Sequence, residues 1–194
     1  MEITSAQIKE LRDKTGISVM QCKKALEEAG GDMDKAVIIL KKKRSEAAEK
    51  KSDRELSSGS VGVYVHNTNE VASMVLLACE SDFVSKNPEF VQLAKEIAMQ
   101  VAATAPNFIN KDELPEATLQ KAKEVFAPEV EGKPEEMKEK IMEGKLAAYF
   151  REQILMEQPF IKNPDVTIAE MVNGAIQKFG ENVSIVKISR VSVK

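Results

Sequence analysis

The side chains that most often perform catalysis or bind metal ions are sparse in this sequence. His66 is the only histidine, and the two cysteines, Cys22 and Cys79, lie in different apolar segments. Metal sites need several ligands at short spacings, and the sequence has no such cluster. It also contains no glycine-rich phosphate loop and no G-x-S-x-G motif. We therefore expect no catalytic residue, no metal and no cofactor, with both thiols reduced and buried.

The most unusual polar stretch is the segment 80–86, with the sequence ESDFVSK. In it the aromatic ring of Phe83 stands beside the carboxylate of Asp82, which is an odd choice for a simple connector. Loops mounted on rigid elements are where binding residues concentrate, so the pair is a candidate binding site. The alternative is that Phe83 folds back over the core as a lid.

Two regular elements must position this segment. Residues 71–79 form an uninterrupted apolar run that is too short for an ordinary helix, and they predict a central strand buried on both faces. Asn87 and Pro88 then have the pattern of an N-cap followed by the first position of a helix. We therefore expect a polar loop that is fixed by a strand at one end and by a helix at the other.

Composition predicts a globular protein that is not targeted to a membrane. The 28 basic and 31 acidic residues give a net charge of −3, which offers no general attraction to nucleic acid or to membranes. No apolar run reaches membrane-spanning length, and no signal peptide is visible at Met1. We expect a cytoplasmic protein without direct nucleic-acid or membrane contacts.

Residues 1–44 predict a module of three short helices. Thr4 and Ser18 each precede a glutamine by three residues, which is the capping-box spacing, and Asp32 can cap the third helix. Helices this short are unstable alone and must pack on one another. The basic run 41–44 closes the third helix, where cations complement the helix dipole; a nucleic-acid patch is the less favoured alternative.

The remainder predicts a linker and a second folding unit. Residues 45–59 are polar and form a helical tail that leads into a linker. Residues 60–194 predict an α+β core, in which a small antiparallel sheet of about three strands is covered by helices. The expected strands lie at 61–65, 71–79 and 183–193. The apolar phase of the last strand shifts, which predicts either a bulge or an end that leaves the sheet. One expected helix begins at Pro88, and three more cover residues 115–131, 134 to about 157, and 168–179. We expect residues 158–163 to be extended.

Several stretches resemble the elongation factor Ts family. In the first module the matching stretches are 11–16, LRDKTG, and 20–29, MQCKKALEEA, and this module is also similar to ubiquitin-associated domains. Residues 81–84, SDFV, stand where the family has its signature Thr-Asp-Phe-Val, and the serine keeps the hydroxyl. Residues 158–163, QPFIKN, match a motif near the carboxy terminus. The resemblance extends over the whole chain.

This resemblance implies a guanine-nucleotide exchange factor that performs no covalent chemistry. Such a factor binds elongation factor Tu carrying GDP and promotes release of the nucleotide, so that GTP can load. The signature residues Ser81, Asp82, Phe83 and Val84 would then lie beside the Mg²⁺ and phosphate site of the GTPase. Phe83 would act as the wedge and Asp82 as its polar partner.

The resemblance also implies contacts away from this segment. In the first module these are Arg12, Val19, Met20 and Lys23, although the family commonly has methionine where this chain has Val19. Met20 has the alternative interpretation of a core residue. His66 corresponds to a histidine that faces the partner at the rim of the sheet in the family.

Chain length leads to one further expectation and leaves two rivals. Longer family members have two copies of the sheet unit and this chain has material for one, so we expect a homodimer, joined at a sheet edge, 61–65 or 183–193. One rival is an adaptor for a ubiquitin-like protein. The other is an enzyme, which is disfavoured because the sequence has few side chains that could perform catalysis or bind a metal ion.

Overall fold

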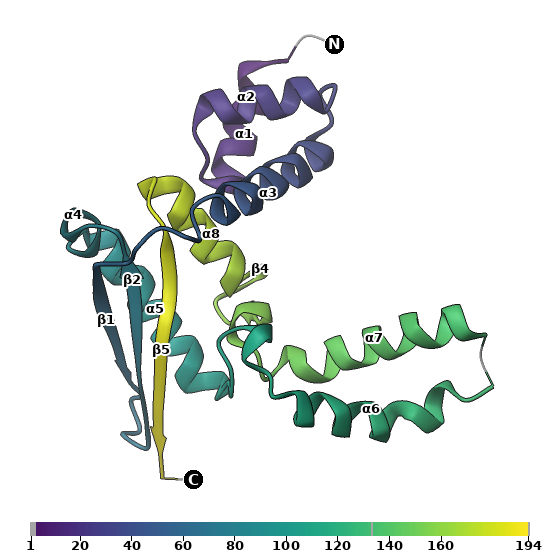
Figure 1. The fold of residues 1–194 in the computed structure, drawn as a ribbon. Helices are drawn as coiled ribbons and strands as arrows, with labels where there is room; N and C mark the ends of the chain where they lie inside the picture. The colour runs from purple at the N-terminus through teal and green to yellow at the C-terminus, as the bar shows by residue number, and fades with distance from the viewer. Residues whose placement is uncertain (1–2, 133, 194) are drawn as a thin grey trace.

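A computed structural model describes residues 3–132 and 134–193, and it combines helices with a small antiparallel sheet (Figure 1). Within this part of the chain the larger sheet has three strands in the order β1-β2-β5. They span Ser58–Val65, Val71–Cys79 and Val183–Ser192, and both pairings are antiparallel. The α+β class with about three antiparallel strands is therefore confirmed.

Strand β5 contains the irregularity that its sequence pattern predicts. Leu76 of β2 pairs with Lys187, whereas the next residue, Leu77, pairs with Ile185. Val186 is therefore an extra residue in β5, which is a β-bulge and which bends the strand locally. Of the two alternatives that the phase shift predicts, the bulge is confirmed.

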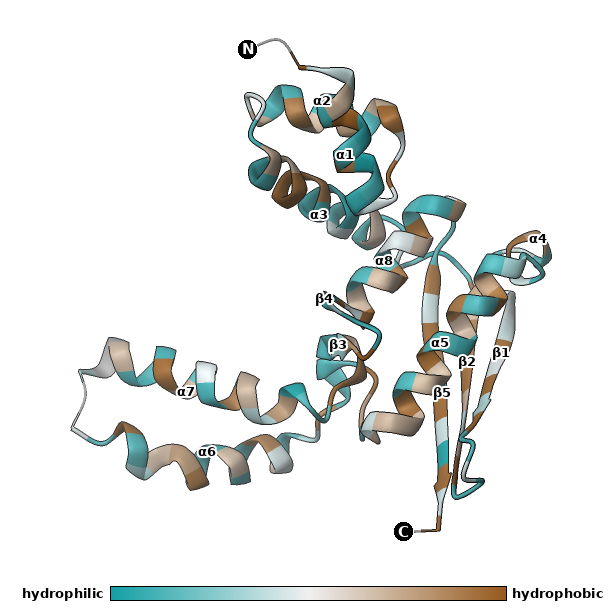
Figure 2. Cartoon of the chain, turned by 180° about the vertical axis from the view of Figure 1, so that it is seen from behind, coloured by the Kyte–Doolittle hydropathy of each residue, from teal (hydrophilic) through white to brown (hydrophobic). Residues whose placement is uncertain are grey.

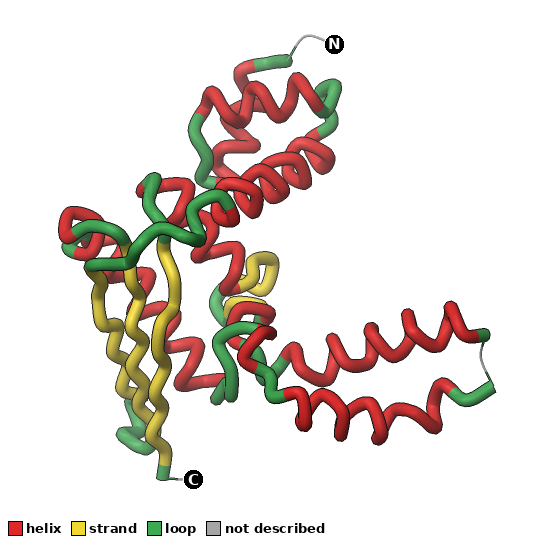
Figure 3. The backbone as a smooth tube through the Cα atoms, in the orientation of Figure 1, coloured by secondary structure: helices red, strands yellow, loops and turns green. Residues whose placement is uncertain are grey.

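One face of the sheet is covered by helices α5, Pro88–Thr104, and α8, Ile168–Phe179, as the tube in Figure 3 shows. Asn87 caps α5 and Thr167 caps α8, as their sequence patterns predict. The main core lies between these helices and the sheet, and it includes the fully buried side chains of Val75, Leu77, Phe90, Ile97 and Ile168.

The opposite face of the sheet is open to solvent. Register places Val61 and Val63 of β1, Met74 of β2 and Val191 of β5 on this face, and all four side chains are exposed. Apolar residues mark all three strands in the hydropathy view of Figure 2. The prediction that β2 is buried on both faces is wrong, because no described element covers Met74. We call the set Val61, Val63, Val65, Met74 and Val191 the open face.

Three helices form the first unit, as predicted. They are α1, Ser5–Thr15, α2, Val19–Glu28, and α3, Met33–Glu49, and they share a separate apolar cluster around Leu11 and Leu26. Side chains of the three predicted residues, Thr4, Ser18 and Asp32, cap them.

Helix α3 runs past the basic segment 41–44 to Glu49, which confirms the helical tail predicted at the start of residues 45–59. The added residues, SEAAE, are mostly good helix formers. Its second half contacts α8: Lys41 lies 2.8 Å from Glu170, and Arg44 donates to Gln177 at 2.8 Å. Arg44 also donates to the carbonyl of Thr15, so that one side chain ties α1 to α8. The predicted domain boundaries stay predictions.

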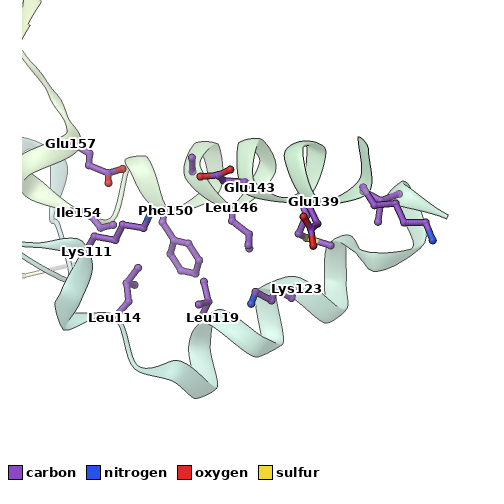
Figure 4. Close-up of a pocket in the computed structure, with 14 residues that line it drawn as sticks. Lys111, Leu114, Leu119, Lys123, Glu139, Glu143, Leu146, Phe150, Ile154 and Glu157 are labelled. Carbon is purple, nitrogen blue, oxygen red and sulfur yellow. The ribbon is translucent and has the colours of Figure 1, made fainter. Parts of the chain in front are cut away.

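Two helices form an arm that extends from the core (Figure 1). Helix α6, Glu116–Val130, and helix α7, Glu135–Arg151, pack as the predicted antiparallel pair, joined near Gly132. Their small core centres on Leu146 and Phe150. A groove of about 550 Å³ runs between them and is lined mostly by apolar side chains such as Leu119 (Figure 4).

The segment after α7 differs from its prediction. Helix α7 ends at Arg151 rather than near residue 157, and a 3₁₀ turn, Leu155–Glu157, follows. The predicted extended stretch then contains strand β3, Pro159–Phe160, which pairs with β4, Asn163–Thr167. A second 3₁₀ turn, Lys111–Glu113, connects α5 to the arm.

Candidate functional site

The segment that follows β2 is a helical turn rather than the predicted polar loop. Helix α4 spans Asp82–Ser85, and Ser81 precedes it in an extended conformation, with φ −123° and ψ 158°. The Ser81 hydroxyl accepts a hydrogen bond from the amide of Val84, which caps the turn. A serine two residues after a strand, followed by an aspartate, is an N-cap signal that the sequence analysis did not use.

The two sides of this turn have opposite environments. Val84 joins the main core and Ser85 is also buried, whereas the Phe83 side chain is 86% exposed. The alternative that Phe83 covers the core as a lid is therefore wrong. An exposed phenylalanine on a turn anchored by its neighbours is a ready apolar contact for a partner.

Strand β1 contacts the turn through the hydroxyl groups of two serines. The hydroxyl of Ser58 donates to the hydroxyl of Ser85 at 2.8 Å, and the hydroxyl of Ser60 donates to the carbonyl of Ser85. The Ser85 hydroxyl donates in turn to the carbonyl of Asp82 at 3.1 Å. These contacts fix the backbone on both sides of Phe83.

Asp82 points its charge to solvent and pairs with a local cation. Its carboxylate lies 2.8 Å from the ammonium group of Lys86, one helical turn later. The hydrogen bond and the charge of Lys86 hold the pKa of Asp82 below its usual value, so the carboxylate is ionised at neutral pH. Phe83 therefore lies beside a permanent negative charge.

The thiol of Cys79, which precedes the turn in the chain, is not exposed to solvent. Cys79 is buried at the end of β2 and donates to the carbonyl of Ser81 at 3.2 Å. Burial raises the pKa of the Cys79 thiol, which keeps it neutral and a poor nucleophile. Cys22 is buried in the first unit, and both thiols are free, as predicted. Within the described ranges, no group of three or more His, Cys, Asp or Glu could hold a metal ion.

Two acidic side chains that the sequence analysis did not single out contact the start of the turn. Glu181, in the connection between α8 and β5, accepts hydrogen bonds from the amides of Glu80 and Ser81. The side chain of Glu80 accepts in return from the amide of Asn182. Only the tertiary fold brings these residues together, because about 100 residues separate them in the chain.

The predicted contact residues of the first unit lie at the surface. Val19 and Met20 open α2, and the Met20 side chain is 69% exposed, so its alternative interpretation as a core residue is wrong. Arg12 on α1 and Lys23 on α2 are also exposed, and Lys23 lies 3.9 Å from Glu27. Their roles stay predictions.

His66 lies far from the Phe83 turn. It follows the last residue of β1, and the first residue of that strand, Ser58, contacts the turn. With a rise of about 3.3 Å per residue, the eight-residue strand puts roughly 23 Å between its ends. The His66 ring nitrogen Nδ1 lies 3.1 Å from the Tyr64 hydroxyl. The exposed His66 thus marks the opposite rim of the sheet.

Comparison with known proteins identifies the family. The family model described as elongation factor TS matches residues 43–194. The chain is 44% identical over 194 residues to the elongation factor Ts of Thermodesulfovibrio yellowstonii, covering all of this chain and 97% of that protein. It is 46% identical over 192 residues to that of Syntrophus aciditrophicus, covering 98% and 96% of the two chains.

The chain belongs to the elongation factor Ts family. Membership implies a role in translation elongation, and the resemblance stated from the sequence is confirmed. The family assignment leaves open which surface of this elongation factor Ts homologue contacts a partner. Of the surfaces described above, the Phe83 turn has the largest exposed apolar side chain, and hydrogen bonds of Ser81, Ser58 and Ser60 hold its backbone or its neighbours. No helix in the described ranges is long and apolar enough to cross a membrane.

Proposed function

We propose that this protein is a guanine-nucleotide exchange factor for elongation factor Tu. It binds the GDP-bound GTPase, promotes release of GDP and leaves the nucleotide-free form ready for GTP. The observation that carries this proposal is the exposed Phe83, held on a capped turn in a member of the elongation factor Ts family. Because exchange proceeds in the translation machinery, we place the protein in the cytoplasm, without direct nucleic-acid or membrane contacts.

In this mechanism Phe83 enters the GTPase beside the Mg²⁺ and phosphate site, with Asp82 as its polar partner. A P-loop GTPase holds the phosphates through backbone amides, a lysine and Mg²⁺. An apolar ring cannot bind the phosphates as the amides, the lysine and Mg²⁺ do. Insertion of Phe83 therefore displaces these groups without replacing their contacts to the phosphates. The negative charge of Asp82 competes for the same positive groups. Ser81 and Val84 hold the two residues in place, and this chain forms or breaks no covalent bond.

A single ring cannot supply all the binding energy that exchange requires. Nanomolar GDP affinity corresponds to roughly −12 kcal/mol, whereas burying one phenylalanine contributes about 1.5–3 kcal/mol. The remainder must come from other surfaces. The exposed Arg12, Val19, Met20 and Lys23 of the first unit and His66 at the far rim are the proposed further contacts. Linkage requires GDP to weaken binding of the factor by the same amount.

We also propose that two copies of the chain associate through the open face. Val61, Val63 and Met74 expose an apolar surface on a sheet whose other face is already covered. Two such faces can pack together around a twofold axis, because the same patch meets itself. The seam at a sheet edge, 61–65 or 183–193, which the sequence analysis expects, stays a prediction beside this placement. Sedimentation at micromolar concentration should give a dimer mass; a monomer at that concentration would contradict the proposal.

The exchange function is tested by the release of fluorescent GDP from elongation factor Tu. We expect the wild-type protein to accelerate release many-fold and Phe83→Ala to lose most of that effect. The matched control is Val125→Ala, which truncates an exposed apolar side chain on α6, away from the turn. If wild type fails at micromolar concentration, the exchange function is wrong. Binding to a ubiquitin-like protein would then favour the adaptor. If Phe83→Ala and wild type act equally, the wedge role is wrong.

A further inference from the structure

The connection between α8 and β5 contacts the base of the Phe83 turn through one carboxylate. Glu181 Oε2 accepts hydrogen bonds from the amide nitrogen of Glu80 at 3.1 Å and from that of Ser81 at 3.0 Å. Glu181 Oε1 accepts a hydrogen bond from the Ser81 hydroxyl at 2.5 Å. Both oxygens of one side chain are therefore used by two consecutive residues. Bonds to an ionised acceptor are the stronger kind.

The same two segments exchange a contact in the opposite direction. Glu80 Oε1 accepts a hydrogen bond from the amide of Asn182, and Arg54 lies 3.3 Å from the same oxygen. The side-chain amide of Asn182 donates to the carbonyls of Ser52 and Arg54. Each segment thus offers its carboxylate to the backbone amides of the other. The reciprocal arrangement fixes their relative position more firmly than either contact alone.

Glu181 also determines how the hydroxyl of Ser81 is used. A serine hydroxyl has one hydrogen to donate and two lone pairs that can accept. Because its hydrogen goes to Glu181, a lone pair is left to accept from the amide of Val84, which is the cap of α4. A single helical turn is unstable without such support. Removal of the carboxylate would free the hydroxyl to rotate and would weaken the cap.

We propose that Glu181 is a positioning residue that sets the direction in which Phe83 projects. This inference rests on the proposed exchange function, in which Phe83 is the wedge. Glu181 acts on Phe83 through Ser81 and through the cap of α4. Loss of Glu181 therefore leaves the exposed contact residues of the first unit intact. It reduces the fraction of bound complexes in which Phe83 is aligned for insertion.

The test measures the rate of fluorescent GDP release from elongation factor Tu against the concentration of the factor. We expect Glu181→Ala to lower the saturating rate at least ten-fold while the half-saturating concentration changes less than three-fold. Glu181→Gln should recover part of the rate, because its amide oxygen can accept from both backbone amides, whereas its NH2 group cannot accept the hydrogen of the Ser81 hydroxyl. The control Glu124→Gln removes an exposed carboxylate on α6 and should match wild type.

Three results would overturn the proposal. One is an unchanged saturating rate in Glu181→Ala. Another is a rate for Glu181→Gln no higher than that of Glu181→Ala, since the two contacts to backbone amides would then have no part in the effect. A purely structural role would raise the half-saturating concentration and lower the melting temperature together, and this outcome also contradicts positioning.

A second measurement separates this proposal from the exchange function itself. Fluorine NMR of protein labelled with fluorophenylalanine reports on Phe83 without any GTPase, and Phe83→Ala identifies its resonance. We expect Glu181→Ala to shift or broaden that resonance and Glu181→Gln to restore it in part. If the wild-type protein fails to release GDP but the resonance responds in this way, the exchange function is wrong, while the role of Glu181 in positioning Phe83 is supported. An unchanged resonance in Glu181→Ala would contradict that positioning role.

Discussion

The two faces of the sheet come from the same three strands but present opposite kinds of side chain. Towards α5, strand β1 presents Ser58, Ser60, Gly62 and Tyr64, and β2 presents the buried Val75. Towards solvent, the same strands present Val61, Val63 and Met74. Between Ser58 and Val63 the smaller side chains of β1 therefore face the core and the valines face outward, the reverse of what alternation usually suggests, and only Tyr64 places a large side chain of β1 against the core.

Close approach of α5 explains this reversal. A Cβ atom built on Gly62 would lie 2.1 Å from the carbonyl oxygen of Ala94 and 2.7 Å from the amide nitrogen of Lys95. The backbone of α5 thus rests directly on the backbone of β1, and a valine on that side could not fit. The covered face of β1 therefore has no room for a side chain at Gly62, whereas the open face has apolar side chains that no described element covers.

Gly62→Ala should disrupt the packing of α5 on the covered face, and this is the largest effect that we expect. The added methyl group would meet backbone atoms that cannot move without displacing α5, so we expect the free energy of unfolding to fall by about 3 kcal/mol or more. Urea unfolding followed by circular dichroism measures the change. The matched control is Gly144→Ala on α7, where a Cβ meets nothing within 4 Å.

The control should move stability in the opposite direction. Alanine is favoured over glycine within a helix by roughly 0.5–1 kcal/mol. If Gly62→Ala unfolds at the same urea concentration as wild type, α5 does not rest on β1 as closely as described. A loss in both variants would point to a general cost of alanine rather than to close approach.

The sequence predicted most of the fold because its local signals agreed with one another. The caps at Thr4, Ser18 and Asn87 and the apolar run of β2 each marked an element that the structure contains. Alternation along β1 predicted a strand but could not say which side faces inward, because that depends on how closely α5 approaches. The full burial expected for β2 is wrong for a different reason: no described element covers the face of Met74, and a local apolar run cannot show this.

The candidate site was only partly predictable. The chemistry of Asp82 and Phe83 beside a strand end could be seen in the sequence, yet the exposure of Phe83 could not, since a lid over the core was also compatible with the pattern. Contacts from Glu181 join residues about 100 positions apart, and no local signal predicts such a pair. The cap by Ser81, in contrast, has a local signal and was missed.

Val63→Lys tests the open face. Val63 is half exposed, so a lysine there should change the unfolding free energy of one chain by less than about 0.5 kcal/mol. If two open faces pack together, two lysines would be buried without partners, and the dimer should dissociate. Analytical ultracentrifugation at several concentrations measures the shift. Val125→Lys, an exposed valine on α6, is the matched control and should keep the wild-type mass.

Two results would speak against the open face as the dimer surface. One is a Val63→Lys protein that remains a dimer at the lowest concentration measured. The other is dissociation by Val63→Lys and Val125→Lys alike, which would indicate an effect of charge rather than of position. Dissociation by Val63→Lys alone would sharpen the contrast between the covered face and the open face.

Acid should weaken the end of the sheet where the two faces meet the Phe83 turn, and this is the smallest expected effect. The amide of Asn182, followed by Arg54, lowers the pKa of Glu80 below its usual value. Because the folded-state pKa lies below the unfolded value of about 4.3, this stabilisation is complete above that pH and is lost as pH falls through the folded value.

The expected profile is therefore flat with respect to Glu80 from pH 7 to about 5 and falls below about pH 4.5. The melting temperature measured across this range should show the fall in wild type and a smaller fall in Glu80→Gln, which has no charge to lose. Because Val63→Lys neither adds nor removes a carboxylate, it should retain the acid profile of a single wild-type chain. If Glu80→Gln reproduces the full wild-type loss, the Glu80–Asn182 contact does not stabilise this end of the sheet, and the Phe83 turn is held by β1 and Glu181 without it.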